Sequence, residues 1–306
     1  MMIIRNVNIK KWLFGLIIGL FLLASSCTEN PFSSPEDIEM AVISGEVEME
    51  EEDQSDVYVY LDGFNLTDVT NEKGKFSLPI SSNYQRGTEK SYTGRFRLYF
   101  FISDYYLKYI EISFINGQLV ENQDIISENG KIKNKIYLKK LINVETSFVE
   151  EGEKKDTITV EKNREQKVKC NVTYLADSFM SVKIPSNIRV REGTSYFGLI
   201  FYPIKNNKDF KIYDSHKYVS SSLNRVVLYS NDPKTIEYKI YPDQFDIEPG
   251  FYKVTPYVQI EYPYSIHEEL QRRIESLGDS IKVENKTYHI LPNKFDHSII
   301  NFTESN

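Results

Sequence analysis

Short runs in which apolar and polar residues alternate constrain the fold of this chain more than any other feature. Such a period of two is typical of β-strands that bury one face, and turn-forming residues separate the runs. The composition agrees, because 22 Tyr and 18 Phe residues suit the pleated, half-buried surface of a sheet. Helical periodicity is confined to one short segment. The sequence therefore predicts an all-β chain of two consecutive β-sandwich domains.

Residues 39–142, the first predicted domain, contain glycines at fixed distances from apolar strand positions. Three motifs follow in order: Gly45 and Val47; Val57, Val59, Leu61 and Gly63; Thr70, Asn71, Gly74, Phe76 and Leu78. This pattern resembles the carboxypeptidase regulatory-like, or transthyretin-like, domain, from which it departs by an acidic insert at residues 50–53. The resemblance implies a β-sandwich that acts as an accessory module and has no activity of its own.

Two turns are expected between these motifs. Residues 46–56 hold seven carboxylates, but a calcium loop needs carboxylates alternating with carbonyl ligands around a tight turn. The run lacks that spacing and has no glycine after Gly45, so we expect a solvated hairpin tip. At residues 71–74, Gly74 can adopt a positive φ, which predicts a hairpin with a bulge.

Residues 143–306 form the second predicted domain, to which we assign no family. Short, closely spaced strand patterns predict a second sandwich, Ig-like in a broad sense. The predicted strands are 156–160, 166–175, 179–184, 196–204, 221–229, 235–241, 250–262, 281–291 and 298–302. Pro256 lies inside one of them, which argues for a sheet edge or a bulge at that position.

One helix is expected near residues 265–277, ending before Gly278. Ser265 can cap its first turn, and Glu268 can complete a capping box. The apolar stripe of this helix would consist of Ile266, Leu270, Ile274 and Leu277. We expect the helix to cover an open end of the second sandwich; docking onto a partner protein is the alternative.

Two cysteines occur in the chain, Cys27 and Cys170. The apolar face of the strand pattern around Cys170 consists of Val168, Cys170, Val172 and Tyr174. This alternation predicts a buried thiol that acts as a small hydrophobic side chain, with a catalytic thiol as the alternative. If Cys27 is acylated, Cys170 has no partner and a disulfide framework is excluded.

The first 26 residues are organised like a secretory signal, with a basic start and small residues before the cleavage point. The uncharged stretch 12–24 is short for a spanning helix, which needs about 20 apolar residues. The sequence LASSC, ending at Cys27, resembles a bacterial lipobox, although Ala24 stands where Leu is preferred. The resemblance implies cleavage before Cys27 and acylation of this residue; an ordinary secretory signal or an uncleaved anchor is the alternative.

Residues 27–38 are polar, contain two prolines and two serines, and are expected to be a tether. Thr28 differs from the Asp that resembles an inner-membrane retention signal. We therefore favour a lipid anchor in the outer membrane of the cell envelope, on either its periplasmic or its surface face. The lipid on Cys27 would be the contact with the membrane.

The charge balance disfavours nucleic-acid binding. Loss of residues 1–26 would remove three basic and no acidic residues, which changes the formal net charge from −7 to −10. A nucleic-acid binder needs a basic surface, and anionic headgroups would repel this chain as well. Membrane attachment would consequently depend on the lipid.

No catalytic residue, metal site or cofactor is predicted. The segment that starts at His267 begins like a zincin helix but has Gln271 where the second metal-binding His is required. None of the four histidines is followed three residues later by Glu, which a zinc carboxypeptidase would require. Carboxylate pairs for glycoside hydrolysis depend on a geometry that the sequence does not contain.

These observations predict a non-enzymatic, lipid-anchored envelope protein that binds or scaffolds a protein or glycan partner. Sandwich loops or a Tyr-rich face would make the contact, although most tyrosine rings are expected in the core. A glycan hydrolase is the second hypothesis and requires two carboxylates about 5–10 Å apart between aromatic rings. The third is a subunit of an outer-membrane uptake or secretion assembly, which would show a flat, exposed apolar patch.

Overall fold

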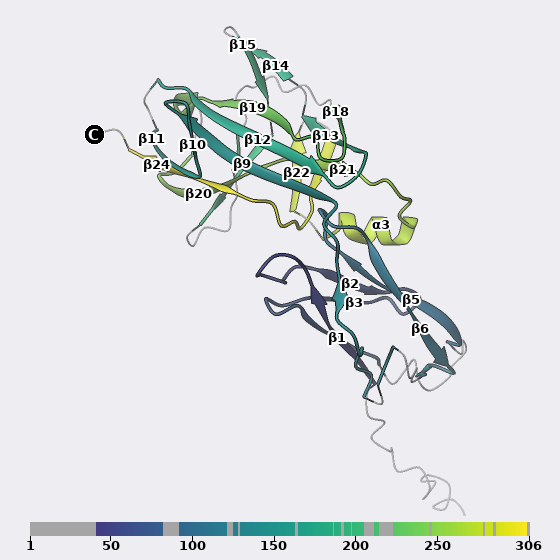
Figure 1. The fold of residues 1–306 in the computed structure, drawn as a ribbon. Coiled ribbons are helices and arrows are strands. Elements are labelled where there is room, and N and C mark those ends of the chain that lie inside the picture. Colours follow the sequence, from purple (N-terminus) through teal and green to yellow (C-terminus); the bar gives the residue numbers. More distant parts are fainter. Residues whose placement is uncertain are drawn as a thin grey trace, which may run out of the picture. The chain divides into compact units, whose positions relative to one another are not determined.

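The protein is described here from a computed structural model (Figure 1). The structure describes residues 41–81, 92–120, 125–127, 129–162, 165–185, 187–190, 193–196, 198–204, 211–213, 223–244, 247–277, 279–283 and 286–304. These segments are mostly β-strands with one α-helix and one 3-10 turn, η1 (Pro242–Gln244), which confirms the all-β prediction with one short helix. None of the helices within these segments has the length and apolar character needed to cross a bilayer. The predicted signal peptide, residues 1–26, and tether, residues 27–38, lie outside the described residues.

Two sheets enclose a first hydrophobic core. The smaller sheet has the order β4-β1-β8 and consists of β1 (Val42–Glu48), β4 (Lys75–Pro79) and β8 (Ile136–Tyr137). The larger has the order β3-β2-β5-β6-β7 and consists of β2 (Tyr58–Leu61), β3 (Leu66–Val69), β5 (Gly94–Phe101), β6 (Lys108–Ile115) and β7 (Gln118–Leu119). The apolar motif positions of the sequence, among them Val47, Val59 and Phe76, are buried between these sheets.

The turn at Gly74 forms, but it does not close a hairpin. Gly74 has a φ of +72°, and its N–H donates to the carbonyl of Asn71 at 2.8 Å. The flanking strands enter different sheets, because β3 pairs with β2 and β4 pairs with β1. The hairpin prediction was therefore wrong: the turn carries the chain from one sheet to the other, and the carbonyl of Gly74 accepts the N–H of Val47 at 2.8 Å.

Replacing Gly74 by alanine should destabilise the fold strongly. A Cβ there would lie 2.2 Å from the carbonyl oxygen of Val47, in a backbone region that costs L-residues about 1–2 kcal/mol. We expect Gly74→Ala to lower the free energy of unfolding, measured with urea, by more than about 2 kcal/mol. Gly152→Ala is the control, because Gly152 has a φ of +87° with no atom within 4 Å of the added Cβ. Equal losses in the two variants would contradict this account of Gly74.

Two further sheets enclose a second core, with β9 and β12 layered over β20 and β24 (Figure 1). One sheet has the order β10-β9-β12-β19 and consists of β9 (Ile142–Glu150), β10 (Glu153–Lys155), β12 (Val168–Ala176) and β19 (Lys234–Ile240). The other has the order β11-β24-β20-β16-β17 and consists of β11 (Thr157–Glu161), β16 (Leu199–Pro203), β17 (Lys211–Tyr213), β20 (Gly250–Pro256) and β24 (Ser298–Thr303).

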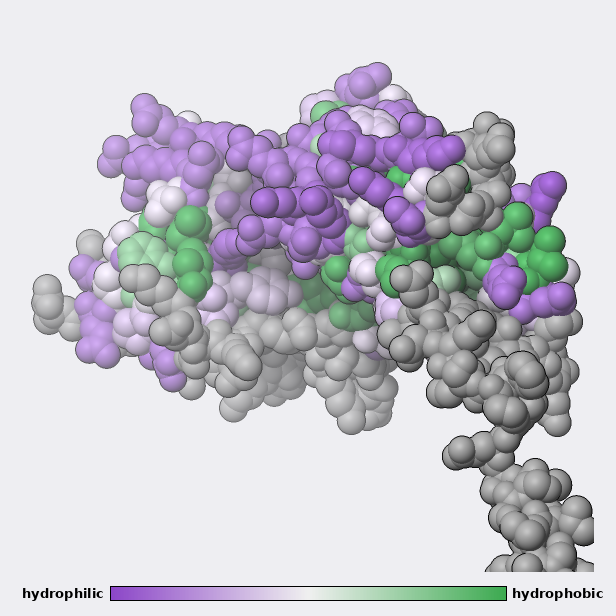
Figure 2. All heavy atoms as spheres, turned by 90° about the horizontal axis from the view of Figure 1, so that it is seen from below, coloured by the Kyte–Doolittle hydropathy of each residue, from purple (hydrophilic) through white to green (hydrophobic). Residues whose placement is uncertain are grey.

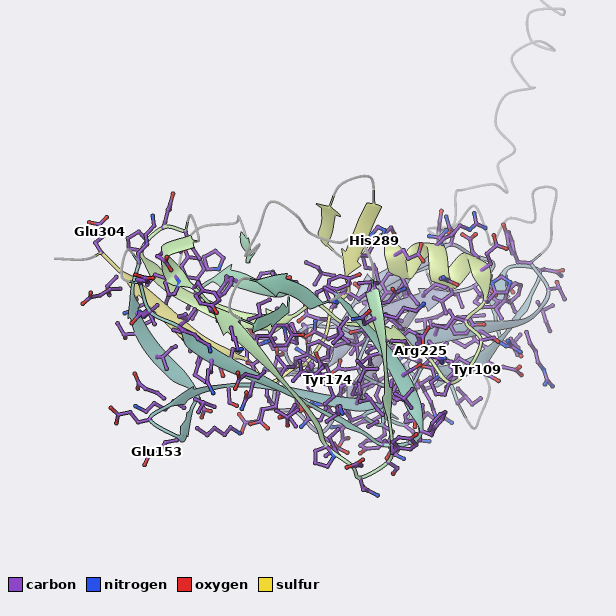
Figure 3. All side chains as sticks on the ribbon, turned by 90° about the horizontal axis from the view of Figure 1, so that it is seen from above. Tyr109, Glu153, Tyr174, Arg225, His289 and Glu304 are labelled. Carbon is purple, nitrogen blue, oxygen red and sulfur yellow. The ribbon has the colours of Figure 1, made fainter. Side chains whose placement is uncertain are left out.

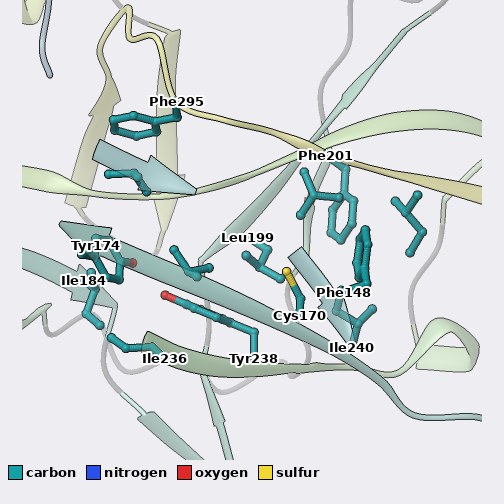
Figure 4. Close-up of a cluster of buried hydrophobic side chains, with 14 of the residues drawn as sticks. Phe148, Cys170, Tyr174, Ile184, Leu199, Phe201, Ile236, Tyr238, Ile240 and Phe295 are labelled. Carbon is teal, nitrogen blue, oxygen red and sulfur yellow. The ribbon is translucent and has the colours of Figure 1, made fainter. Parts of the chain in front are cut away.

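Cys170 lies in this second core, as the alternation of its strand predicted (Figure 4). Its side chain has no exposed surface, and burial raises the pKa of its thiol to about 12. A thiol held neutral in this way is a poor nucleophile. The hydroxyls of Tyr174 and Tyr238 face each other in the same core.

Two predicted strands are each divided in the structure. The run 250–262 forms β20 and then β21 (Gln259–Glu261), which belongs to the sheet β18-β13-β21 with β13 (Met180–Pro185) and β18 (Leu223–Leu228). Pro256 is the last residue of β20. It pairs with Leu199 of β16, but the pairing of β20 with β24 ends at Val254, so the proline stands where one side of the strand is unpaired, as the edge prediction required. The run 281–291 forms a hairpin of β22 (Asp279–Val283) and β23 (Lys286–Ile290). A further hairpin consists of β14 (Asn187–Val190) and β15 (Gly193–Tyr196).

The helix α3 (Glu268–Glu275) differs from its prediction in its start and in its place. His267 is the N-cap residue and no side chain caps the helix, so the capping box of Ser265 was wrong. Leu270 and Ile274 are buried, as the apolar stripe predicted. These two side chains pack on the outer face of the first sandwich, against the rings of Tyr58, Tyr60, Tyr99 and Phe101. The prediction that the helix closes an open end of the second sandwich was therefore wrong.

The two sandwiches belong to one compact unit, Ala41–Asn306. The first core draws its buried residues from positions 43–138 and the second from positions 141–302. Residue 142 as a domain boundary stays a prediction.

Candidate functional site

A row of tyrosines on β2 and β5 is the surface that α3 covers. The ring centroids of Tyr58 and Tyr60 lie 6.4 Å apart, and those of Tyr60 and Tyr99 lie 6.3 Å apart, with interplanar angles of 7° and 15°. The guanidinium carbon of Arg273 on α3 lies 4.9 Å from the centroid of the Tyr60 ring. Every residue of β2 is buried, since its other face lies in the first core. The tyrosine row therefore functions as a docking face inside the chain.

The loop after β5 forms hydrogen bonds with residues 262–292 of the second sandwich. The N–H of Ser103 donates to the carbonyl of Pro292 at 3.0 Å, and the hydroxyl of Tyr262 donates to the carbonyl of Ser103 at 3.1 Å. The N–H of Leu107 donates to the hydroxyl of Tyr264 at 2.8 Å. These bonds join residues more than 150 positions apart, so they fix the return of the chain toward β24.

Asp104 is the central residue of this loop and has no exposed surface. Its carboxyl oxygens accept the N–H of Lys294 at 3.1 and 3.2 Å. Its carbonyl accepts the N–H of Leu141 at 2.8 Å and that of Ile142 at 3.2 Å, where the chain enters the second sandwich. Burial raises the pKa of the Asp104 carboxyl to about 7, although the N–H of Lys294 and the charge of Lys140 act against this shift.

The acidic run does not close a hairpin, because β1 pairs with β4 and β8 whereas β2 pairs with β3 and β5, so that part of the prediction was wrong. Its side chains at Glu50, Glu52, Asp53 and Asp56 are exposed, as predicted, and part of the run forms ion pairs. Glu51 pairs with Lys140 and accepts the hydroxyl of Tyr105 at 2.9 Å. The ammonium of Lys294, only 10% exposed, lies 2.8 Å from Asp53 and 3.3 Å from Asp56. Lys140, just before the second sandwich, and Lys294, within it, thus pair with three of the seven carboxylates. Within the described part of the chain, no group of three or more acidic, His or Cys side chains is placed to hold a metal.

The Asp104 carboxyl makes stability depend on pH. Its pKa of about 7 lies above the ordinary 3.8, so the folded protein keeps a proton that the unfolded chain releases. The stabilisation is therefore complete below about pH 4 and is lost as the pH rises through about 7. Asp104→Asn keeps a neutral acceptor for Lys294 at every pH. Relative to the wild type, this variant should gain about 2–3 kcal/mol of unfolding free energy between about pH 5 and pH 8.

Urea denaturation at several pH values measures this gain. Asp232→Asn, a change at an exposed aspartate, is the control and should follow the wild-type pH profile. If Asp104→Asn followed the same profile, the carboxyl would not titrate in this range and the assignment would fail.

A half-open cavity of about 780 Å³ lies beside this junction. Ser103 of the first sandwich lines it, together with residues of β21, α3 and the end of β23. Its aromatic lining consists of Tyr257, Tyr262, Tyr264 and Phe295. Its other polar side chains belong to Gln259, Ser265, Gln271, Glu275, His289 and Asn293. His289 stands at the end of the hairpin strand beside α3 (Figure 3).

A second cavity of about 540 Å³ lies next to the first, and Ile290, Leu291 and Asn293 line both. His297 lines this second cavity, and burial, with the nearby charge of Lys253, lowers its pKa to about 4. His267 is exposed at the start of α3, so these histidines do not converge on one site. The zincin-like start of that helix therefore has no metal-binding counterpart among the described residues.

The surface also carries a small apolar patch where β12 turns into β13. Figure 2 shows hydrophobic residues in separate groups among hydrophilic ones on one face of the molecule. Phe179 is 65% exposed and Tyr229 is 58% exposed, with their ring centroids 5.6 Å apart. Leu175 and Val227 are exposed as well. We call these four residues the apolar patch.

Sequence reasoning missed Asp104 and the cavity. The pair Ser103-Asp104 directly after an apolar strand is the only local signal, and many loops contain such a pair. Cys27, the predicted lipidation site, lies outside the described residues.

Comparisons with known proteins add little. No family model matches the chain, and no curated protein matches it. A crystal structure of BcpA*(D312A), the major pilin subunit of Bacillus cereus, is 9% identical, and the match covers 87% of this chain and 96% of that one. The TM-score is 0.25, so this likeness assigns neither a fold nor a function.

Proposed function

We propose that this protein is a lipid-anchored, non-catalytic binding module of the cell envelope, acylated at Cys27. Its ligand site is the cavity of about 780 Å³ at the junction of the sandwiches, and this cavity is the observation that carries the proposal. Ligand pockets in proteins commonly enclose about 300–1,000 Å³ and combine aromatic walls with a few polar groups. The proposal includes attachment to the outer membrane and two domains, 39–142 and 143–306.

The lining of the cavity supports binding over hydrolysis. Glycoside hydrolysis requires two carboxylates on either side of the scissile bond. Among the described residues that line the cavity, Glu275 carries the sole carboxylate, and its Oε1 accepts the amide N–H of Gln271 at 3.1 Å. The buried Asp104 is bonded to the backbone of Lys294 and does not line the cavity.

The lipid anchor is tested by moving the protein off the membrane. Cys27→Ala should transfer it from the membrane fraction to the soluble fraction or leave it uncleaved, because Cys27 would carry the acyl chains. Cys170→Ala is the matched control and should stay in the membrane fraction, since Cys170 is buried in the second core. Mass spectrometry of the native protein should find a diacylglyceryl group on a chain that begins at residue 27. An intact leader, or an unmodified thiol at residue 27, would refute the anchor.

The apolar patch favours a second candidate function, a subunit of an outer-membrane assembly. Exposed apolar patches on soluble domains often mark contacts with other proteins. Phe179→Ser with Tyr229→Ser should abolish crosslinking of the native protein to a membrane-protein partner, with little loss of stability because both rings are exposed. Val69→Ser, which removes an apolar side chain that is 48% exposed on the first sandwich, is the control. Unchanged crosslinking in the double variant would exclude this surface.

A further inference from the structure

The walls of the cavity are fixed by hydrogen bonds within the protein. The hydroxyls of Tyr262 and Tyr264 bond to Ser103 and Leu107. The amide of Asn293 donates to the carbonyl of Leu291 at 3.0 Å, and its oxygen accepts the N–H of Phe295 at 3.2 Å. These groups have partners without a ligand, so the cavity is largely pre-formed and its aromatic rings are held in place.

Other polar groups around the cavity remain available to a ligand. The side chains of Gln259 and Ser265, both exposed, form no hydrogen bond to another described residue. Glu275 is exposed and has an acceptor oxygen that the amide of Gln271 does not use. The cavity thus offers both donors and acceptors, which suits hydroxyl groups, because each hydroxyl both donates and accepts.

The charges of the cavity disfavour an anionic ligand. Its described lining contains no Lys or Arg, whereas Glu275 carries a negative charge. The whole chain is acidic, with a formal net charge of −7. A carboxylate or phosphate would enter without a cation to pair with and would be repelled by Glu275.

The aromatic rings complete the set of features. Tyr257 and Phe295 line the cavity with the pair Tyr262 and Tyr264, whose ring centroids lie 5.5 Å apart. The C–H faces of a pyranose pack against such rings, while its hydroxyl edge meets amides and hydroxyls. An extended peptide fits less well, because β21, one of the strands that line the cavity, pairs over only three residues and offers a short edge.

We infer that the cavity binds a short segment of uncharged glycan. The inference rests on the proposed function, since it takes the same cavity as the ligand site and names its ligand class. Gln259, Ser265 and Glu275 hold the sugar hydroxyls, and the aromatic rings hold the sugar faces. Removal of a single hydrogen bond should weaken binding about tenfold, and filling of the cavity should abolish it.

Calorimetric titration of the full chain, purified in detergent, tests this inference. The uncharged probes are chitobiose, cellobiose, maltose and the methyl ester of digalacturonate; free digalacturonate is the anionic counterpart of that ester. We expect at least one uncharged disaccharide to bind, and digalacturonate to bind at least about tenfold more weakly than its ester. Gln259→Ala should weaken the binding of the uncharged sugar about tenfold, and Ser265→Tyr should abolish it.

The control variant is Gln118→Ala, which changes an exposed glutamine on β7 and should bind like the wild type. Thermal unfolding of each variant separates lost binding from lost folding, since Gln259 and Ser265 are both exposed. Equal affinity for digalacturonate and its ester, or sugar binding that Ser265→Tyr leaves intact, would overturn the inference.

Failure of this inference is distinguishable from failure of the proposed function. If no uncharged sugar binds but Ser265→Tyr abolishes crosslinking of the native protein to an envelope component, the glycan inference fails and the binding function stands. If no sugar binds and Ser265→Tyr leaves that crosslinking unchanged, the cavity is not a ligand site and both fail.

Discussion

A carboxyl group without solvent exposure, that of Asp104, holds the junction on which the rest of the structure depends. Its carboxyl oxygens accept the backbone N–H of Lys294, and its backbone carbonyl accepts the N–H groups of Leu141 and Ile142. One residue of the first sandwich thus fixes both the exit of the chain into the second sandwich and its return toward β24. Burial of a carboxyl is costly unless it is hydrogen-bonded or neutral, and the raised pKa of Asp104 follows from that cost.

The helix α3 connects this junction to the cavity. Leu270 and Ile274 pack on the tyrosine row of the first sandwich, while Ile274, Gln271 and Glu275 line the cavity. Ile274 therefore belongs to both surfaces. A displacement of α3 from the tyrosine row would open one wall of the cavity, so the shape of the proposed ligand site depends on the contact between the sandwiches.

The sequence predicted local periodicity well and long-range packing poorly. Alternation placed Cys170 in a core, and the apolar stripe identified Leu270 and Ile274, because both patterns depend on residues close in the chain. The same stripe did not show which surface α3 covers, since Tyr58 and Tyr60 lie about two hundred residues earlier in the chain. Alternation in their strand also assigns the face with these tyrosines to solvent, whereas in the structure α3 covers it. The partners of Asp53 and Asp104 lie at Lys294, a separation that no local pattern can reveal.

The central claim, that α3 of the second sandwich docks on the first, is tested most directly by a double-mutant cycle between Arg273 and Tyr60. The guanidinium of Arg273 lies over the Tyr60 ring at 4.9 Å. Unfolding free energies of Arg273→Ala, Tyr60→Leu and the double variant should reveal a coupling of about 0.5–2 kcal/mol, as expected for a cation over an aromatic ring. Strict additivity of the two single effects would contradict the contact, and with it the cavity wall that the contact supports.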